Sequence, residues 1–377
     1  MSGLPSAKRI AIIYRTMAGL SGTPNTIMDH ARYLGAEGFQ VSLVGEKMDR
    51  RRILEVGAQA VRLRRWPLPR SLRLRHFSWR AERQARACDF VAGHGHNLHQ
   101  DVLSLHNCLH LAHERTYGYA LSRPGANVAF QDLLLRSGAF SFCIANSNLM
   151  RQDLLARYHL APERVEVIYP GFQPRRFNCE RHEDIRQEVR AEWGVDKSRF
   201  LLGLVTSGSF EKRGVDLAIQ AVADLPATLR REVLLLVVGK EGNQSTFRQR
   251  AEACGVSSHI RFLPPTDRIE RYYHGLDLCL HPARFEEFGQ TVQEAMACGL
   301  PVIGSRQVGA LEMLPRPVWD SLPEVMTVSA LVERVQAFIG SESLCQQWRD
   351  YGLQAVAWNS DRVNFQQTLA LYRRAGL

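Results

Sequence analysis

The sequence lacks the features that define membrane-spanning, secreted and disulfide-stabilised proteins. No apolar run approaches the length of about eighteen residues that a membrane span needs. The first residues, MSGLPSAKRIAIIY, hold a short apolar run that predicts a first strand rather than a signal peptide. The eight cysteines form no C-x-x-C pair, and in a chain of 377 residues this favours reduced thiols in a cytoplasmic protein.

Acidic residues are scarce between positions 50 and 86, where twelve arginines stand against two glutamates. Within this segment, RLRRWPLPRSLRLRHFSWR (62–80) interleaves arginines with tryptophans, leucines and a phenylalanine. Such a composition suits an anionic membrane surface, where each basic residue adds about 1 kcal/mol and the apolar side chains insert shallowly. A nucleic-acid surface would use the same chemistry, and a solvated basic loop is the third interpretation.

Apolar, β-branched runs alternate with helical patterns along the chain, and this order predicts an α/β protein with doubly wound parallel sheets. The predicted strands are 9–14, 40–44, 90–92, 102–106, 142–146, 165–169, 200–205, 233–238, 260–263, 277–281 and 302–304. The predicted helices include 25–37, 149–158, 215–223, 246–254 and 290–298. Prolines, a glycine and a charged run at 169–188 predict a linker between two domains, and ligands of such sheets bind at the carboxyl ends of the strands.

The segment HPARFEEFGQTVQEAMACGLPVIGS (281–305) carries the most chemistry. It predicts a strand end, a loop and a helix that starts near Gly289 and stops at Gly299. The backbone amides of Phe288, Gly289 and Gln290 would point out of the helix N-terminus, where the helix dipole favours an anion such as phosphate. Glycine at position 289 lets a phosphate approach the backbone closely.

Two carboxylates bracket this predicted anion site. Glu286 lies in the loop before the helix, and Glu294 lies about a turn and a half inside it. Beside a phosphate, a carboxylate suits paired hydroxyl donors, such as those of a ribose or a sugar ring. A surface loop followed by an amphipathic core helix is the alternative for each glutamate alone, but the complete string is much less expected by chance.

The run EEFGQTVQEAMACGLPV (286–302) resembles the E-x7-E signature of retaining glycosyltransferases of the GT-B fold, family 4. Three further blocks resemble the family in the same order: VEVIYPGFQPRRF (165–177), GLVTSGSFEKRGVDLAIQAV (203–222) and RYYHGLDLCLHPA (271–283). The forms GSFEKRGVD and HPA are most similar to the glucosyl-type transferases of lipopolysaccharide core assembly. The resemblance covers the C-terminal half well and the N-terminal half loosely.

The resemblance implies the GT-B fold, in which two Rossmann-like domains with doubly wound parallel sheets face a cleft. We expect an N-terminal acceptor domain at residues 1–172 and a C-terminal nucleotide-sugar donor domain at residues 173–355. We expect a C-terminal helix within residues 356–377 to pack back on the N-terminal domain.

The resemblance also implies roles for residues of the C-terminal half. Arg213 and Lys212 would take the donor diphosphate; the family usually has lysine at the position of Arg213, and a guanidinium is a bidentate phosphate partner. Glu294 would hold the ribose hydroxyls of the nucleotide, and Glu286 would contact the hydroxyls of the donor sugar. The amides of residues 288–290 would contact the phosphate.

The sequence contains no D-x-D pair, the motif with which metal-dependent glycosyltransferases of the other main fold hold Mg²⁺ or Mn²⁺. The resemblance therefore implies a reaction without a metal or a cofactor, in which Arg213, Lys212 and the helix amides stabilise the leaving diphosphate. It implies transfer with retention of configuration, by attack on the oxocarbenium-like centre from the face that the diphosphate leaves. The family often has a further basic residue at the position of Gly208, so that phosphate contact has no counterpart here.

In the N-terminal half, IAIIYRTMAGLSGTPNTIMDHARYL (10–34) resembles the first strand and glycine loop of the family. The loop would hold Gly19, Gly22 and Thr23 and would face the cleft near the transferred sugar or the acceptor. It is not a G-x-G-x-x-G motif, and a plain connecting loop is the alternative.

Six of the thirteen histidines stand in GHGHNLHQDVLSLHNCLHLAH (93–113). His106, His110 and His113 have a helical i, i+4, i+7 spacing, but His106 falls at a predicted junction of strand and loop, which speaks against a zinc site. We expect His99, His110 and His113 to be surface or packing residues.

By its position in SLHNC, His106 corresponds to a cleft histidine of the family near the donor sugar. It would hydrogen-bond a donor hydroxyl and support the developing charge. Related core transferases carry an acidic residue close by, where this sequence has Asn107, and an amide cannot act as a base. His94 and His96 are second candidates, for contacts with the acceptor.

These features together predict a glycosyltransferase that moves a hexose from UDP-glucose or UDP-N-acetylhexosamine to a lipopolysaccharide core acceptor. Residues 50–86 would contact the anionic inner membrane, so we expect the chain in the cytoplasm, peripheral on the inner face of that membrane, with no nucleic-acid partner. Another polysaccharide or a lipid carrier is the alternative acceptor. A basic nucleic-acid-binding protein on a degenerate GT-B scaffold is the alternative class, but it would not need Glu286, Glu294 and Arg213 together.

Overall fold

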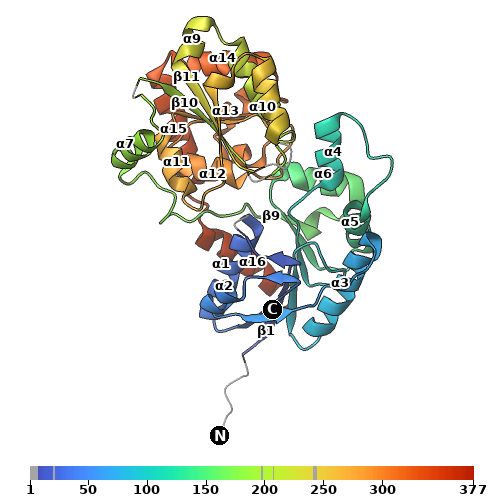
Figure 1. The fold of residues 1–377 in the computed structure, drawn as a ribbon. Helices are drawn as coiled ribbons and strands as arrows, with labels where there is room; N and C mark the ends of the chain where they lie inside the picture. Colours follow the sequence, from blue (N-terminus) through green and yellow to red (C-terminus); the bar gives the residue numbers. More distant parts are fainter. Residues whose placement is uncertain (1–6, 20–21, 197, 207, 241–243) are drawn as a thin grey trace. The chain divides into compact units, whose positions relative to one another are not determined.

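The computed structural model describes residues 7–19, 22–196, 198–206, 208–240 and 244–377, which form two compact α/β units (Figure 1). The first unit comprises Met1–Glu114, Gly118–Gly171 and Asp361–Leu377, and the second comprises Arg115–Tyr117 and Phe172–Ser360. Arg115–Tyr117 are the last three residues of a helix that begins in the first unit. Apart from them, the chain passes into the second unit after Gly171 and returns to the first after Ser360.

The first unit contains a seven-stranded sheet in the order β5-β3-β1-β6-β7-β8-β9, and each neighbouring pair is parallel. Its strands are β1 (Arg9–Ile13), β3 (Gln40–Gly45), β5 (Gln59–Arg62), β6 (Phe90–Gly93), β7 (Val102–Ser104), β8 (Phe142–Ala145) and β9 (Val165–Val167), and β2 (Thr16–Met17) pairs separately with β4 (Lys47–Met48). Its helices are α1 (Gly22–Ala36), α2 (Arg50–Glu55), α3 (Arg70–Ala85), α4 (Leu109–Tyr117), α5 (Ala126–Ser137), α6 (Asn148–Tyr158), a 3-10 turn (Pro162–Arg164) and α16 (Asp361–Arg374).

The second unit contains a five-stranded parallel sheet in the order β12-β11-β10-β13-β14. Its strands are β10 (Phe200–Val205), β11 (Val233–Val238), β12 (Ile260–Leu263), β13 (Leu278–His281) and β14 (Val302–Gly304). Its helices are α7 (His182–Glu192), α8 (Val215–Asp224), α9 (Ala227–Glu232), α10 (Gln244–Ala253), α11 (Ile269–Gly275), α12 (Gln290–Ala297), α13 (Arg316–Ser321), α14 (Val328–Ile339) and α15 (Glu342–Val356), with 3-10 turns at Ser257–His259 and Gly309–Met313.

The predicted α/β class with parallel sheets is confirmed. The burial of the strands explains why the sequence pattern indicated their positions. The interior strand β11 has the sequence VLLLVV, and all six of its residues are buried. Four residues of β1 are buried as well. Strands of a parallel sheet are covered on both faces, so they form continuous apolar runs rather than alternating ones.

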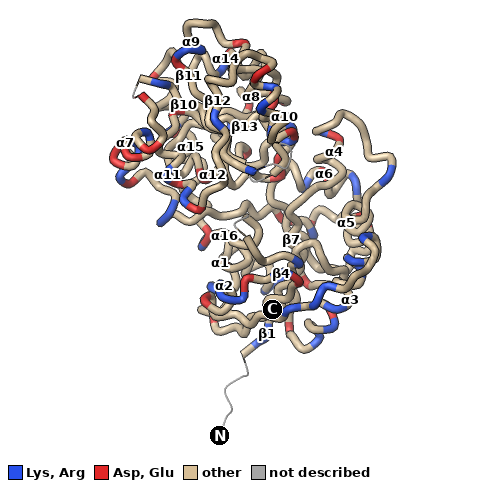
Figure 2. Tube along the Cα trace, viewed as in Figure 1, with Lys and Arg blue, Asp and Glu red and all other residues tan. Residues whose placement is uncertain are grey.

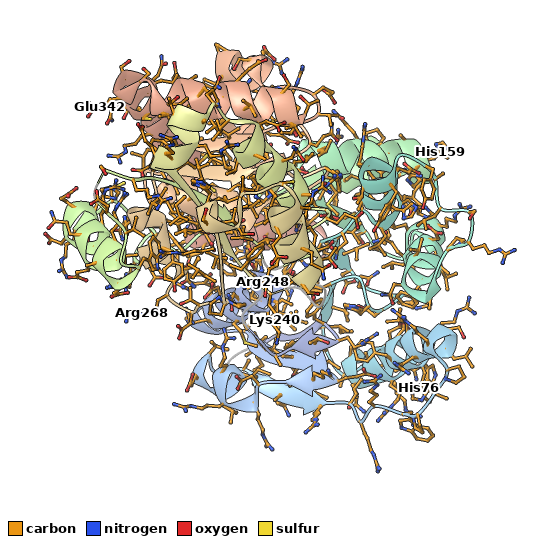
Figure 3. The ribbon with its side chains drawn as sticks, turned by 45° about the horizontal axis from the view of Figure 1, so that its top comes forward. His76, His159, Lys240, Arg248, Arg268 and Glu342 are labelled. Atoms are coloured by element: carbon orange, nitrogen blue, oxygen red, sulfur yellow. The ribbon has the colours of Figure 1, made fainter. Side chains whose placement is uncertain are left out.

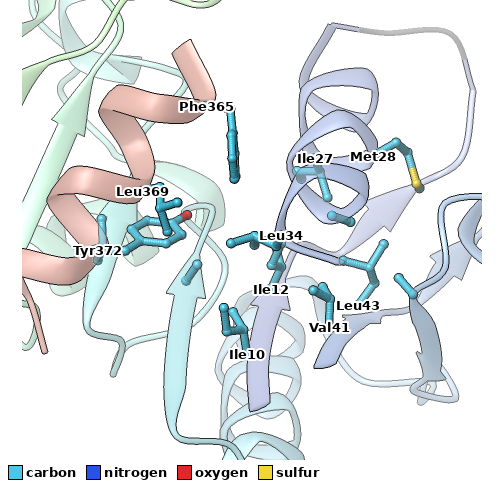
Figure 4. Packing of buried hydrophobic residues seen from close by; sticks show 14 of the residues in the cluster. Ile10, Ile12, Ile27, Met28, Leu34, Val41, Leu43, Phe365, Leu369 and Tyr372 are labelled. Atoms are coloured by element: carbon cyan, nitrogen blue, oxygen red, sulfur yellow. The ribbon is translucent and has the colours of Figure 1, made fainter. Parts of the chain in front are cut away.

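The last helix, α16, completes the core of the first unit (Figure 4). Its buried Phe365, Leu369 and Tyr372 belong to the same apolar cluster as Ile10 of β1 and Leu34 of α1. The buried ring of Tyr372 also lies 4.9 Å from the ring of Phe90, centroid to centroid. Burial of large apolar side chains contributes roughly 1.5–3 kcal/mol each, so α16 is an integral part of this unit.

The interpretation of the basic segment as a loop is wrong for residues 70–85, which form α3. Leu74, Phe77 and Ala81 recur at helical spacing on its buried face, and Phe77 and Ala81 join the apolar cluster beneath the helix. The arginines between them occupy the remaining positions, so the apolar stripe is narrow and the mean hydropathy of the helix is low. Among the described residues, no helix is long and apolar enough to span a bilayer.

The predicted start of α1 is also wrong, because the helix begins at Gly22 and not at residue 25. Gly22 and Thr23 therefore lie in the first helical turn rather than in the preceding loop. Pro24 is the third residue of this turn, where a missing backbone N–H removes no intrahelical hydrogen bond.

Candidate functional site

The helix α12 begins at a glycine in the left-handed region of backbone conformation. Gly289 precedes the first helical residue with φ of +99°, which glycine adopts without steric cost. A Cβ atom at this position would lie 3.1 Å from Cγ of Glu286. Within the described part of the chain, the backbone amides of Gly289 and Gln290 donate to no acceptor, which is the arrangement that binds anions at helix N-termini.

The loop that carries Glu286 is fixed by backbone hydrogen bonds to the segment after β14. The N–H of Glu286 donates to the carbonyl of Gln307 (2.8 Å), and the N–H of Gly309 donates to the carbonyl of Glu286 (3.1 Å). The N–H of Ala310 donates to the carbonyl of the buried Phe288 (2.6 Å). The Glu286 carboxylate is therefore held in a defined place next to the start of α12.

The structure brings Glu286 and Arg213 together, although 73 positions separate them in the sequence. The Arg213 guanidinium forms an ion pair with the Glu286 carboxylate and donates to the carbonyl of Phe285 (3.2 Å). His281 Nε2 lies 3.4 Å from the same carboxylate. Burial alone would raise the pKa of Glu286, but Arg213, His281 and Lys212 outweigh burial and lower that pKa to about 2. Glu286 is therefore ionised at any physiological pH.

Lys212 has a different partner, which the sequence did not indicate. Its Nζ lies 2.8 Å from Oε2 of Glu287 and 5.2 Å from the centre of the Phe285 ring. Gly214, two residues further on, has φ of +70°, and a Cβ atom there would lie 2.1 Å from the carbonyl oxygen of Pro282. Only glycine permits this close approach, which joins the loop after β10 to the loop after β13.

Glu294 lies on α12 and is half-buried. The Tyr273 hydroxyl donates to Oε2 of Glu294 (3.2 Å). Burial raises the pKa of Glu294 to about 7, although this hydrogen bond and the charge of Arg176 act in the opposite direction. Two carboxylates of one signature thus differ in ionisation: Glu286 is held charged by its cations, whereas Glu294 titrates near neutrality.

In the first unit, His106 lies in the loop between β7 and α4, so its predicted place at a junction of strand and loop is confirmed. Its Nε2 lies 2.8 Å from Nδ1 of His94, which follows β6, and the two rings stack with centroids 5.1 Å apart. The ring of Tyr14 lies 4.9 Å from His96 and 6.4 Å from His106. The carboxyl ends of β1, β6 and β7 therefore meet in one cluster of aromatic and imidazole rings.

His94 is buried and His96 and His106 are half-buried, and this loss of contact with water is the main reason why all three clustered imidazoles are neutral at physiological pH. Burial lowers the pKa of His106 to about 4 and that of His96 to about 3, and it lowers the pKa of His94 well below its usual range. In each case neighbouring charges act in the same direction. A neutral His106 can donate or accept a hydrogen bond but has no proton to give as an acid.

The other histidines of the segment lie apart from this cluster. His99 pairs with Glu82 (2.9 Å) at the surface, and His110 pairs with Asp132 (3.1 Å). Asn107 is exposed, and its backbone carbonyl accepts from the side chain of Gln131 (2.7 Å). No three histidine, cysteine, aspartate or glutamate side chains of the described residues gather in a way that could hold a metal ion.

The glycine segment near α1 is tied to α2 by one arginine. The Arg52 guanidinium donates to the carbonyl of Gly19 (3.2 Å) and to Oδ1 of Asn25 (2.9 Å). Gly19 has φ of +93°, so glycine suits this turn. The Tyr14 hydroxyl hydrogen-bonds Thr23, which links the start of α1 to the histidine cluster.

Acidification is expected to destabilise the first unit through its clustered histidines. In the folded state the pKa of His106 is about 4, whereas an unfolded imidazole takes up a proton below about 6.5. The unfolded state therefore binds more protons between pH 6.5 and 4, and the free energy of unfolding falls across this window, by on the order of 3 kcal/mol for His106 alone. Chemical denaturation of the wild type and of His106→Asn as a function of pH measures this effect. The wild type should lose more stability than the variant, and equal slopes would contradict the assignment.

Comparison with known proteins agrees with this architecture and with these motifs. Residues 185–355 match the family described as glycosyl transferases group 1, and residues 20–176 match Glycosyltransferase Family 4. Lipopolysaccharide glucosyltransferase WaaG of Escherichia coli (strain K12) is 32% identical over 200 residues, which are 53% of this chain and 53% of the relative. D-inositol 3-phosphate glycosyltransferase 1 of Catenulispora acidiphila is 29% identical over 266 residues, which are 67% of this chain and 62% of the relative.

Two solved structures share the fold over nearly the whole chain. The crystal structure of WaaG aligns with a TM-score of 0.81 at 20% identity and covers 96% of this chain and 99% of that chain. The crystal structure of HepE from Anabaena in complex with UDP and glucose aligns with a TM-score of 0.80 at 19% identity, with coverage of 97% and 100%. The two Rossmann-like units define the class of GT-B proteins.

Within that class, this chain belongs to the glycosyltransferases of the family 4 type. The two matched regions together leave out only the first nineteen residues, residues 177–184 and the end of the chain after residue 355. The sequence alignment with WaaG spans about half the length of that relative.

Proposed function

We propose that this chain is a retaining glycosyltransferase that moves a hexose from a UDP-sugar to a lipopolysaccharide core acceptor. The observation that carries the proposal is the placement of Arg213 and Glu286 beside the start of α12, with Glu294 on the same helix. Cationic and anionic groups are thus fixed around two backbone amides that have no acceptor among the described residues. A phosphate-linked sugar offers negative oxygens and hydroxyl donors in the same arrangement.

The roles follow from the chemistry of each group. Arg213 and the amides of Gly289 and Gln290 bind the diphosphate and stabilise the charge that develops as it leaves. The ionised Glu286 accepts hydrogen bonds from hydroxyls of the donor sugar. Glu294 accepts hydrogen bonds from the ribose, and Lys212 adds positive charge beside the diphosphate. The acceptor hydroxyl attacks from the face that the diphosphate leaves, which retains the anomeric configuration, and no metal takes part.

The histidine cluster serves the sugar side of the reaction. A neutral His106 hydrogen-bonds a donor hydroxyl, and His94 fixes the orientation of its ring through the Nδ1–Nε2 contact. The loop at Gly19 and the start of α1 at Gly22 approach the transferred sugar or the acceptor.

The relatives support the donor and the acceptor that we propose. HepE was crystallised with UDP and glucose, which favours a UDP-sugar and a glucosyl group. WaaG is named as a lipopolysaccharide glucosyltransferase, which favours the lipopolysaccharide core as acceptor. Several other relatives are named D-inositol 3-phosphate glycosyltransferases, so a small phosphorylated polyol is the second candidate acceptor.

Thermal melting in the presence of nucleotides tests the donor site. UDP should raise the melting temperature more than GDP or ADP, because UDP carries the base of the proposed donor. The shift with UDP should persist in EDTA, because the diphosphate is held by protein groups. Absence of stabilisation by any of the three nucleotides would overturn the donor site, and loss of the UDP shift in EDTA would overturn the metal-independent mechanism.

We further propose that α3 and the segment before it contact the anionic inner membrane from the cytoplasmic side. Trp66, Leu72 and Trp79 are exposed by 53%, 52% and 56%, which is unusual for large apolar side chains so close together. Arginines alternate with them in the sequence, and Figure 2 shows basic positions along α3. The ring of His76 on α3, labelled in Figure 3, is tilted against the rings of both Trp66 and Trp79, with centroids 5.3 and 6.3 Å away. Shallow insertion of these rings and attraction of the arginines by anionic lipids act together.

Charge reversal on the exposed side of α3 is expected to weaken membrane binding selectively. The double variant Arg75→Glu/Arg83→Glu should bind vesicles of phosphatidylglycerol and phosphatidylethanolamine at least about thirtyfold more weakly, since each basic residue contributes about 1 kcal/mol. The matched control is Arg231→Glu/Arg250→Glu, which makes the same charge change on exposed positions of the second unit. Sedimentation with vesicles measures the effect, and equal losses in the two variants would contradict a specific membrane face.

A further inference from the structure

The first unit has a surface pocket at the carboxyl edge of its sheet, outside the histidine cluster. The pocket is lined by Glu46, Lys47, Arg62, Arg64 and Arg65. Glu46 directly follows β3, and Arg62 is the last residue of β5, which pairs with β3. The lining thus comes from two neighbouring strand ends and the chain that continues from them.

The charges around this pocket are unbalanced. Its one carboxylate, that of Glu46, is nearly buried and lies 3.4 Å from the Arg15 guanidinium, so it is already paired. The four cations are exposed, and none of them has an ion-pair partner among the residues that the structure describes. Four like charges around one concavity repel each other, and a bound anion would relieve that repulsion.

Backbone hydrogen bonds connect the pocket with the histidine cluster. The N–H groups of Glu46 and Lys47 both donate to the carbonyl of Arg15, at 2.9 and 3.1 Å. The residue before Arg15 is Tyr14, whose ring packs on His96. The pocket and the histidines therefore occupy the same edge of one sheet, which is the edge where open α/β sheets bind their ligands.

We propose that this pocket binds a phosphoryl group carried by the acceptor, an inference that rests on the proposed function. Three arginines and one lysine are the side chains that hold phosphate oxygens, the arginines by paired N–H donors and the lysine as a point charge. The donor diphosphate has its own cations, Lys212 and Arg213, in the other unit. An acceptor anchored here by its phosphate presents a hydroxyl to the edge where His106 lies.

Binding of small phosphates to pocket variants tests the proposal. The probes are inorganic phosphate and glucose 6-phosphate, with glucose as the uncharged comparison, measured by calorimetry on the full chain at constant ionic strength. Glucose 6-phosphate should bind the wild type, and Arg64→Gln/Arg65→Gln should weaken that binding at least tenfold, while glucose binds neither protein. The single variant Lys47→Gln should weaken it less. The matched control Arg75→Gln/Arg83→Gln removes the same charge from α3 and should leave glucose 6-phosphate binding unchanged.

Several outcomes would overturn the proposal. The first is equal phosphate binding by the wild type and the pocket variant. The second is a loss of glucose 6-phosphate binding in the α3 control as large as that in the pocket variant. The third is a pocket variant that loses vesicle binding but keeps glucose 6-phosphate binding. The last outcome would assign the cations to lipid headgroups instead. An unchanged UDP shift in Arg64→Gln/Arg65→Gln shows that the variant is folded. If UDP fails to bind the wild type while glucose 6-phosphate binds in the pocket, the proposed donor site is contradicted and the proposed anion pocket is supported.

Discussion

Replacing Arg213 with methionine is expected to lower the turnover of sugar transfer by about two to three orders of magnitude. The guanidinium is held in an ion pair with Glu286, in the loop before α12, and removal of one preorganised donor from developing negative charge costs roughly 2.7–4 kcal/mol in the transition state. The substitution also leaves Glu286 buried without its main counter-charge, so the pKa of Glu286 rises. Steady-state kinetics with a UDP-hexose measure the loss in kcat.

Arg213→Lys is the matched variant, because lysine keeps the positive charge and is the usual residue of the family at this position. We expect Arg213→Lys to retain most of the activity that Arg213→Met loses. A methionine variant with unchanged kcat, or a lysine variant as inactive as the methionine variant with an unchanged melting temperature, would contradict a charge role for this position. Circular dichroism of both variants separates loss of activity from loss of folding.

Binding of uridine is expected to tighten about tenfold between pH 6 and pH 8, and Glu294→Gln is expected to remove this dependence. Burial raises the pKa of Glu294 to about 7, so the carboxyl is mostly protonated at pH 6 and mostly ionised at pH 8. The ionised form accepts both ribose hydroxyls, whereas the protonated form must give up its proton first. Hydrogen bonds to a charged group contribute about 1.5–3 kcal/mol, so the variant should bind roughly ten- to a hundredfold more weakly at pH 8.

Uridine serves as the probe because it carries the ribose without phosphates that titrate in the same range. Calorimetry at several pH values measures the dissociation constants, and 2′-deoxyuridine provides the comparison ligand. The difference between the wild type and Glu294→Gln should shrink when the 2′-hydroxyl is absent. A wild-type affinity for uridine that does not change between pH 6 and pH 8 would remove Glu294 from the ribose site.

The fold of the second unit could be predicted closely from the sequence because its strands are short apolar runs bounded by turn residues. The predicted strands at 200–205, 233–238, 260–263 and 302–304 agree with the structure at both ends. The helix between Gly289 and Gly299 could also be predicted, since a glycine in the left-handed region lies just beyond each of its ends. Local backbone preferences act over a few residues, and a sequence displays them directly.

Other features could not be predicted, because they depend on residues that are distant in the chain. None of the residues of the strand β5 is fully buried. Its sequence, QAVR, therefore needs no continuous apolar run and does not stand out as a strand. The contact of His94 with His106 arises from the pairing of β6 with β7, and the pairing of Lys212 with Glu287 arises from the meeting of two loops. The sequence indicated candidate site residues but not the partners that set their ionisation.

The return of the chain to the first unit has a consequence for the order of folding during synthesis. The core of that unit includes Phe365 and Tyr372 of α16, which leave the ribosome only after the whole second unit has been made. Domains usually fold in the order of their synthesis, N-terminal first. Here part of the apolar surface of the N-terminal unit stays uncovered until α16 has been made. The second unit, which is encoded later, therefore completes its core before the first.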